Sequence, residues 1–110
     1  MTPLQDSIFL AALNQAGIPA PVAELPFAKP RRWKMDFAWP EQRVYLEING
    51  GIFVRGRHSR GASLLKEWEK IAAATALGYR PLFCQPSDCT KPETINAIKL
   101  ALSWGQGGNL

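Results

Sequence analysis

Two carboxylates, Asp36 and Glu47, stand in neighbouring segments that alternate between apolar and polar residues. Alternation with a period of two is typical of β-strands, and two such strands joined by a short turn form a hairpin. Two close carboxylates repel each other unless a proton or a cation lies between them. Mg²⁺ prefers oxygen ligands and keeps positions open for water and phosphate. The pair therefore predicts a Mg²⁺ site, and polar residues on an exposed sheet face are the simpler alternative.

The register of this hairpin decides whether the two acids meet. A turn at residues 39–42 pairs Phe37 with Val44 and places Glu47 diagonally beside Asp36. Diagonal neighbours have Cα atoms about 7–8 Å apart, close enough for both carboxylates to reach one cation. The same register gathers the large apolar side chains on one face, which predicts one buried and one polar face.

The middle of the chain is basic. Residues 29–60 carry eight cationic and three acidic side chains, a local charge of +5 in a chain whose formal net charge is +4. A positive field of this kind attracts polyanions, and arginine in particular binds phosphate through two parallel hydrogen bonds. An ordinary solvated surface is the alternative. The candidate DNA-binding residues are Arg31, Arg32, Lys34, Arg55, Arg57, His58 and Arg60.

His58 is the only histidine of the chain and lies within the basic segment. Its ordinary pKa is close to neutrality, so it can act as a general acid toward a leaving oxygen or contact a phosphate. A histidine in a loop can equally be a plain surface residue, and the sequence leaves both interpretations open.

The segments around these residues predict one small domain over residues 1–110. Capping residues and apolar periodicity predict three helices, and alternation or short apolar runs predict four strands. The order is helix, three strands, helix, strand, helix, an α/β or α+β domain with a mixed sheet. The expected strands span residues 22–28, 31–38, 43–48 and 79–84, the core covers about residues 4–84, and the C-terminal helix covers about residues 91–104.

Packing expectations follow from the same patterns. In the helix after Ser63, an apolar stripe that includes Trp68 is expected to face the core. Trp33 is expected on the core face of its strand. Of the two cysteines, Cys84 is expected to be buried and Cys89 to lie in a loop, both as reduced thiols. No apolar stretch is long enough to span a bilayer, and the first residues lack the pattern of a secretory signal.

The acidic residue on one strand, followed by Glu-x-x on the next, resembles the PD-(D/E)XK nuclease superfamily. Residues 31–40 and 47–51 carry the resemblance, which is closest in style to small phage and prophage endonucleases and to the group related to very-short-patch repair endonucleases. Residues 56–61 and the pair Glu69-Lys70 extend it, so that it covers about residues 20–84. The resemblance implies a restriction-endonuclease-like αβββαβ core, with one additional C-terminal helix here.

By this resemblance, Asp36 and Glu47 would bind Mg²⁺, with Mn²⁺ as a substitute, helped by the main-chain carbonyl of Ile48. The metal would activate water and neutralise charge in the transition state. Asn49 departs from the pattern, because the superfamily usually has a lysine at this position. Its side-chain oxygen can bind the metal or position water, but Asn carries no charge, and Asn49-Gly50 can equally be a simple turn signal. Lys70, reaching in from the following helix, is the expected replacement, and the neighbouring Lys66 is the weaker choice.

These observations together predict a Mg²⁺-dependent DNA endonuclease of the bacterial or phage-infected cytoplasm. One small domain has little surface for reading a long sequence, which favours structure-specific or weakly sequence-specific cutting, with a homodimer as an option. The first alternative is a catalytically impaired nuclease fold that binds nucleic acid without cutting it, as Asn49 would allow. The second is a protein-interaction domain whose basic segment meets an acidic partner.

Overall fold

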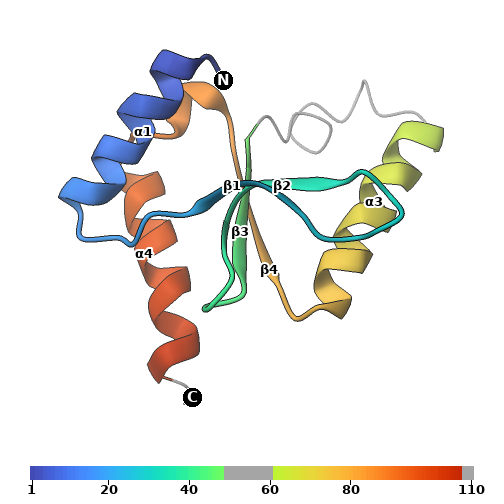
Figure 1. Ribbon diagram of the computed structural model, residues 1–110. Coiled ribbons are helices and arrows are strands. Elements are labelled where there is room, and N and C mark those ends of the chain that lie inside the picture. Colours follow the sequence, from blue (N-terminus) through green and yellow to red (C-terminus); the bar gives the residue numbers. More distant parts are fainter. Residues whose placement is uncertain (49–60, 108–110) are drawn as a thin grey trace.

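The computed structural model describes residues 1–48 and 61–107, and the side chains of residues 1–48 and 65–104. Helices lie on both sides of a central four-stranded sheet, and the C-terminal helix packs beside the first one (Figure 1). This α+β architecture with a mixed sheet confirms the expected fold class. The elements are α1 (Pro3–Gln15), β1 (Val22–Pro26), β2 (Lys34–Trp39), β3 (Val44–Ile48), α3 (Gly61–Ala76), β4 (Arg80–Cys84), the short 3₁₀ helix η1 (Pro86–Asp88) and α4 (Pro92–Gly107).

The sheet has the strand order β1-β2-β3-β4, with the first three strands antiparallel and β4 parallel to β3. Phe37 pairs with Leu46, and Trp39 pairs with Val44. The expected pairing of Phe37 with Val44 is wrong by two residues, because β2 continues through Trp39 and the turn occupies residues 40–43. A shift of two residues leaves every side chain on its original face. In this register, Asp36 lies directly opposite Glu47 on the neighbouring strand.

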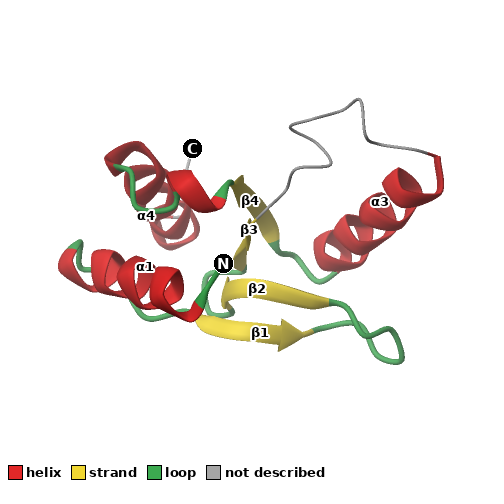
Figure 2. Cartoon of the chain, turned by 90° about the horizontal axis from the view of Figure 1, so that it is seen from above, coloured by secondary structure: helices red, strands yellow, loops and turns green. Residues whose placement is uncertain are grey.

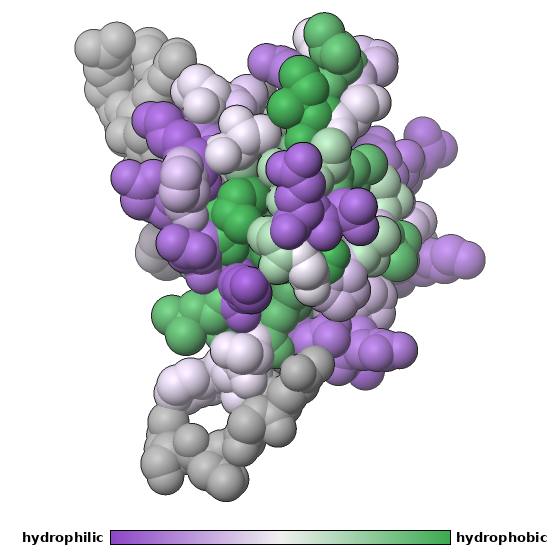
Figure 3. Space-filling view, turned by 90° about the vertical axis from the view of Figure 1, so that its left-hand side faces the viewer, coloured by the Kyte–Doolittle hydropathy of each residue, from purple (hydrophilic) through white to green (hydrophobic). Residues whose placement is uncertain are grey.

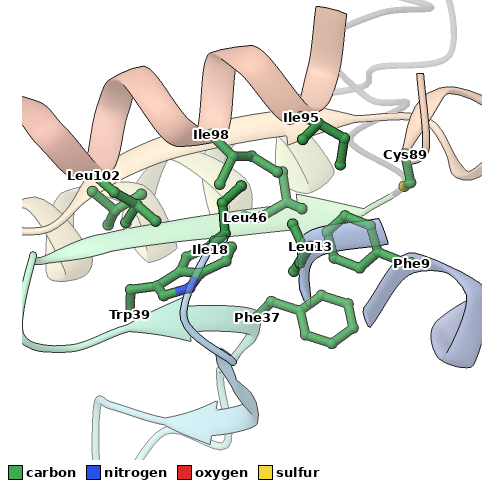
Figure 4. Close-up of a cluster of buried hydrophobic side chains, with 11 residues drawn as sticks. Phe9, Leu13, Ile18, Phe37, Trp39, Leu46, Cys89, Ile95, Ile98 and Leu102 are labelled. Carbon is green, nitrogen blue, oxygen red and sulfur yellow. The ribbon is translucent and has the colours of Figure 1, made fainter. Parts of the chain in front are cut away.

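Helices cover the sheet from both sides. Helices α1 and α4 lie together against one face, and α3 lies against the other (Figures 1 and 2). The larger cluster of buried side chains fills the α1–α4 side (Figure 4). Phe9 of α1 and Phe37 of β2 make a tilted ring contact there, with their centroids 5.2 Å apart. Trp39 is buried in the same cluster, and its Nε1 donates a hydrogen bond to the carbonyl of Pro19 at 2.7 Å.

The second cluster lies between the sheet and α3, and it corrects the expectation of a polar sheet face. Its buried members are Met35, Ala38, Tyr45, Ala74 and Tyr79. Because α3 covers this face, the strand residues that alternate with the main core are buried as well. Met35 joins this cluster instead of the one that contains Phe37, so the regular alternation of β2 is interrupted between the two residues.

Helix α3 is rotated relative to the face that its sequence predicts. Ala74 is fully buried against the sheet, whereas Leu65 and Trp68 are each 61% exposed. The expectation that Trp68 belongs to the core is therefore wrong. The rings of Tyr45 and Tyr79, in edge-to-face contact at 6.3 Å, belong to the same cluster as Ala74. The buried side of α3 therefore meets large aromatic side chains of the sheet through a small residue, Ala74.

Local signals in the sequence act as expected at several element ends. Thr2 and Gln5 form a capping box at the start of α1, with reciprocal hydrogen bonds of 2.9 and 3.1 Å. Gly17, after the end of α1, has a φ of 76°, which glycine adopts more readily than other residues. Pro81 lies in β4, which is an edge strand of the sheet, where the missing amide hydrogen is tolerated.

The two cysteines lie side by side: Cys84 ends β4, and Cys89 lies in the turn after η1, as expected for a loop residue, but it is the more deeply buried of the two. Cys89 is 1% exposed, and Cys84 is half-buried. Their Sγ atoms are 2.9 Å apart and share a hydrogen bond, and Cys89 Sγ donates to the carbonyl of Gln85. Both are free thiols, as expected. The hydrogen bond between the two sulfur atoms, together with burial, raises the pKa of Cys84, and the same bond lowers the pKa of Cys89.

The outer surface of the α1–α4 layer mixes hydrophobic and hydrophilic residues (Figure 3). Leu4 and Ile8 of α1 and Leu100 and Trp104 of α4 are each more than half exposed. In the described part of the chain, every helix is too short or too polar to cross a membrane.

Candidate metal and nucleic-acid site

Asp36 and Glu47 lie opposite each other on β2 and β3. Asp36 precedes Phe37, Glu47 follows Leu46, and Phe37 pairs with Leu46. In an antiparallel pair this register makes the two acids direct neighbours, closer than the diagonal arrangement expected from the sequence. Both residues are partly buried. The structure therefore brings the two predicted carboxylates together, at the end of the β2–β3 pair that is remote from the turn at residues 40–43.

Reciprocal hydrogen bonds hold the two carboxylates. The main-chain N–H of Asp36 donates to Glu47 Oε2 at 3.1 Å, and the N–H of Ile48 donates to Asp36 Oδ2 at 2.8 Å. Each side chain thus satisfies an amide of the opposite strand at the point where the regular ladder stops. Hydrogen bonds to an ionised acceptor are stronger than those between neutral groups. The backbone of the sheet therefore fixes the orientation of both acids.

Lys70 of α3 completes this arrangement from the opposite side. Its Nζ lies 2.5 Å from Glu47 Oε1, and the side chains of Lys70 and Glu47 are 17% and 13% exposed. Lys70 lies one turn before the fully buried Ala74, so the rotation of α3 described above turns the lysine toward the sheet. The alternative, Lys66, is exposed on the same helix. The structure therefore places Lys70, rather than Lys66, beside the predicted site.

The electrostatic environment disfavours a negative charge on Asp36. Burial raises the pKa of Asp36 above its ordinary value, and the nearby charges of Glu47 and Glu24 raise this pKa further. The hydrogen bond from the N–H of Ile48 and the charge of Lys70 lower it in part, without cancelling the effect. A cation beside Asp36 would relieve this destabilisation and lower its pKa.

A cavity of about 420 Å³ opens beside Asp36. It lies at the edge where α1 meets the ends of β2 and β3, so residues far apart in the sequence surround it. Its walls are formed by Met1, Asp6, Ala23, Glu24, Asp36, Phe37 and Ile48. The cavity gives solvent and small ligands access to the carboxylate of Asp36.

Glu24 is the residue of this site that sequence reasoning missed. The paired residues on either side of it in β1 place it next to Asp36 on β2. Its φ of 54° is unusual for a residue other than glycine, and it kinks β1 at the level where the alternation of β2 is interrupted. In the sequence, the only sign of this role is that Glu24 is the one charged residue of its strand. It could not be used because the register of β1 against β2 depends on a seven-residue loop.

The donor types at this site fit a hard divalent cation. Carboxylate oxygens are the ligands that Mg²⁺ prefers, and Asp36 Oδ1 accepts no hydrogen bond from the described residues. Across residues 1–48 and 61–107, no group of three or more His, Cys, Asp or Glu side chains is arranged to hold a metal ion. A metal ion here would have at most two carboxylate ligands from the described residues, Asp36 and Glu47. Both oxygens of Glu47 already accept hydrogen bonds, and carbonyl and water oxygens would have to complete the coordination.

The remaining predicted site residues fall into two groups. Arg31, Arg32 and Lys34 are exposed, in the loop before β2 and at its first position. Trp33, between them, precedes the strand and is half-buried, so its expected place on the core face of a strand is wrong. The other predicted residues lie outside the described residues, namely Asn49, Arg55, Arg57, His58 and Arg60.

Comparison of the sequence with models of known protein families gives no match, and comparisons with curated proteins and with solved structures give none either.

Proposed function

We propose that this protein is a Mg²⁺-dependent DNA endonuclease that hydrolyses phosphodiester bonds with structure-specific or weak sequence preference. One observation carries the proposal: Asp36 and Glu47 face each other on adjacent strands, with Lys70 bound to Glu47. Two acids and a lysine of this kind can hold a cation and supply a positive charge next to it. The αβββαβ order and the basic segment around the acids add support, as does the resemblance to the PD-(D/E)XK superfamily.

In this proposal, Asp36, Glu47 and the carbonyl of Ile48 hold the metal ion. A bound Mg²⁺ would polarise the scissile phosphate and lower the pKa of a coordinated water. The amides of Asp36 and Ile48 keep the two carboxylates oriented before the substrate arrives, so little reorganisation is needed during the reaction.

Lys70 takes the role that the neutral Asn49 cannot fill. Its ammonium group already donates to Glu47 Oε1, and its low exposure strengthens its interactions with charge in the site. In the enzyme–substrate complex, the same group can donate to the attacking water or to a phosphate oxygen. It thereby stabilises the negative charge that develops in the transition state.

The direct test is incubation of the purified protein with supercoiled, nicked, flapped and single-stranded DNA in MgCl₂, with EDTA as the blank. Asp36→Ala and Glu47→Ala are expected to abolish metal-dependent cleavage. Glu41→Ala is the matched control, because Glu41 is an exposed acid in the turn at the other end of the hairpin. Cleavage that persists in either site variant, or that proceeds in EDTA, would exclude this mechanism.

A nucleic-acid-binding protein without nuclease activity is the second candidate function. It is favoured by Asn49 at the position of the usual lysine and by the ion pair that occupies Glu47 Oε1. It predicts salt-sensitive DNA binding that is indifferent to Mg²⁺, with no turnover in Mg²⁺ or Mn²⁺. The same set of substrates, assayed for binding and for cleavage in parallel, separates the two functions.

A further inference from the structure

The loop between β1 and β2 contains a stack of three side chains. The rings of Phe27 and Trp33 are stacked with an interplanar angle of 25° and a centroid separation of 6.5 Å. The guanidinium carbon of Arg31 lies 4.5 Å from the centroid of the Trp33 ring. A main-chain hydrogen bond of 2.7 Å from Arg31 N to the carbonyl of Ala28 closes the loop beneath them. Arginine is therefore held against a rigid aromatic surface.

This stack is connected to the protein core. Phe27 is partly buried and packs against the cluster beneath α3 that contains Met35 and Tyr45. Trp33 is half-buried and Arg31 is exposed, so burial decreases outward along the stack. An exposed arginine normally samples many rotamers, and ordering it on binding costs conformational entropy. Here the contact with Trp33 orders Arg31 before any ligand is present, so less conformational entropy is lost on binding.

The charges around the stack are of one sign. Between Glu24 and Asp36 the sequence contains four cationic side chains and no acidic ones. All four are exposed, and neither of the ion pairs found among the described residues involves them. A guanidinium group held over an aromatic ring can still donate its N–H groups to an external acceptor. The cations are Lys29, Arg31, Arg32 and Lys34.

The loop between β1 and β2 lies close to the acid pair of Asp36 and Glu47. It projects toward the side of the sheet on which α3 lies (Figures 1 and 2). Trp33 precedes Asp36 by three residues, and an extended chain rises about 3.3 Å per residue, so their Cα atoms are at most about 10 Å apart. This separation is close to the rise of about three nucleotides along one DNA strand.

We propose that Arg31, held over the ring of Trp33, is a preformed anchor for a backbone phosphate of a nucleic acid lying across the site of Asp36 and Glu47. This inference deepens the proposed function, because it names the part of the molecule that grips the substrate of that site. Trp33 acts as a positioning residue that fixes the guanidinium group, and Lys29, Arg32 and Lys34 add a general attraction. A phosphate contact sets the position of the nucleic acid and carries no sequence information.

The test measures binding of a fluorescently labelled DNA duplex by anisotropy in EDTA, where no metal-dependent cleavage takes place. Arg31→Ala is expected to weaken binding on the order of tenfold and to lower the slope of log K against log salt concentration by about 1. Lys99→Ala, which removes an equal charge from exposed α4 across the sheet, is the matched control and is expected to change affinity less than twofold. Circular dichroism verifies that each variant is folded.

Two further variants separate a positioned anchor from a simple charge. Arg31→Lys keeps the charge without the planar group, and Trp33→Leu keeps Arg31 without its support. Both are expected to bind more weakly than the wild-type protein does. Trp33→Leu is also expected to lower the salt slope, which a purely structural role for Trp33 would leave unchanged.

The outcomes are distinct from those of the cleavage assay. Equal effects of Arg31→Ala and Lys99→Ala would overturn the anchor, as would wild-type affinity in Arg31→Lys or no DNA binding by the wild-type protein. A protein that never cleaves DNA, and whose binding in EDTA depends on Arg31, would refute the nuclease and support the anchor. A protein that cleaves DNA, but whose DNA binding does not depend on Arg31, would support the nuclease and refute the anchor.

Discussion

Lys70 Nζ and Glu47 Oε1 are 2.5 Å apart and join α3 to β3 across the polar end of the sheet. The partner oxygen, Glu47 Oε2, accepts the amide hydrogen of Asp36. The lysine, the two acids and the backbone therefore form one connected network. Removing a member of such a network has a larger effect than removing an exposed ion pair, because the remaining charges stay partly buried.

Lys70→Met is expected to slow single-turnover DNA cleavage by about two to three orders of magnitude, since loss of one preorganised donor to developing charge has about that effect. The rate constant at saturating protein and MgCl₂ is the measurement. Lys66→Met is the control, because Lys66 is exposed on the same helix. Equal rates for the two variants would show that Lys70 does not take part in the reaction.

Asp36→Asn is expected to raise the stability of the metal-free protein at neutral pH. Because the pKa of Asp36 is raised on folding, its contribution to stability is fully present below the unfolded value of 3.8 and is lost as the pH rises through the folded pKa. Urea midpoints measured in EDTA between pH 4 and pH 8 should therefore diverge in favour of the variant as the pH rises. Parallel pH dependences in the two proteins would contradict the raised pKa.

The same substitution should remove metal-dependent stabilisation. In the wild-type protein, MnCl₂ or MgCl₂ is expected to raise the thermal midpoint progressively with concentration, because the ion binds the folded state alone. The effect should weaken at acidic pH, where protons compete for Asp36. Differential scanning fluorimetry of wild-type protein, Asp36→Asn and Glu41→Ala is sufficient. A thermal midpoint of the wild-type protein that stays constant in both MgCl₂ and MnCl₂ would argue against the metal site.

Tyr45 predicts an alkaline limit to stability. Burial, together with the charges of Glu47 and Glu67, raises its pKa from 10.0 to about 12. Its contribution is therefore complete below pH 10 and is lost as the pH rises toward 12, by at most about 1.4 kcal/mol per pH unit. Tyr45→Phe lacks this loss, so its urea midpoint should fall less steeply above pH 10. Identical pH dependences of the two midpoints would show that Tyr45 titrates normally.

The rotation of α3 predicts opposite results for two neighbouring apolar residues. Trp68→Gln should change the free energy of unfolding by no more than about 0.5 kcal/mol, because Trp68 is largely exposed. Ala74→Leu should cost about 1–3 kcal/mol, since Ala74 is fully buried and a larger side chain there would have to displace its packed neighbours. Urea titrations give both values. A large loss for Trp68→Gln would instead place the tryptophan in the core.

The sequence predicts the order of elements well, because capping residues and alternation are local signals. The capping box at Thr2 and Gln5 forms as expected, and the strand pattern places Asp36 and Glu47 on neighbouring paired strands. The predicted register was wrong by two residues because the sequence does not show whether Trp39 ends the strand or begins the turn. The shift places Glu47 directly opposite Asp36 instead of diagonally beside it, so the two carboxylates remain neighbours despite this error.

The packing of α3 could not be predicted, because its face depends on what lies beneath it. Periodicity alone ranks Trp68 above Ala74 as a core residue. In the structure, Ala74 shares a buried cluster with Tyr45 and Tyr79, and Trp68 is exposed. The same rotation turns Lys70 inward, toward Glu47. Glu24 was missed because the long β1–β2 loop gives no constraint on register.

Two main-chain amides, those of Asp36 and Ile48, report on the state of the acid pair. The amides of Asp36 and Ile48 donate to carboxylates rather than to carbonyls, so the strength of both bonds follows the ionisation of those acids. Exchange with deuterium at these two positions will therefore change when a proton or a cation occupies the site. Mass spectrometry or NMR can follow occupancy in this way with no substrate and no added label.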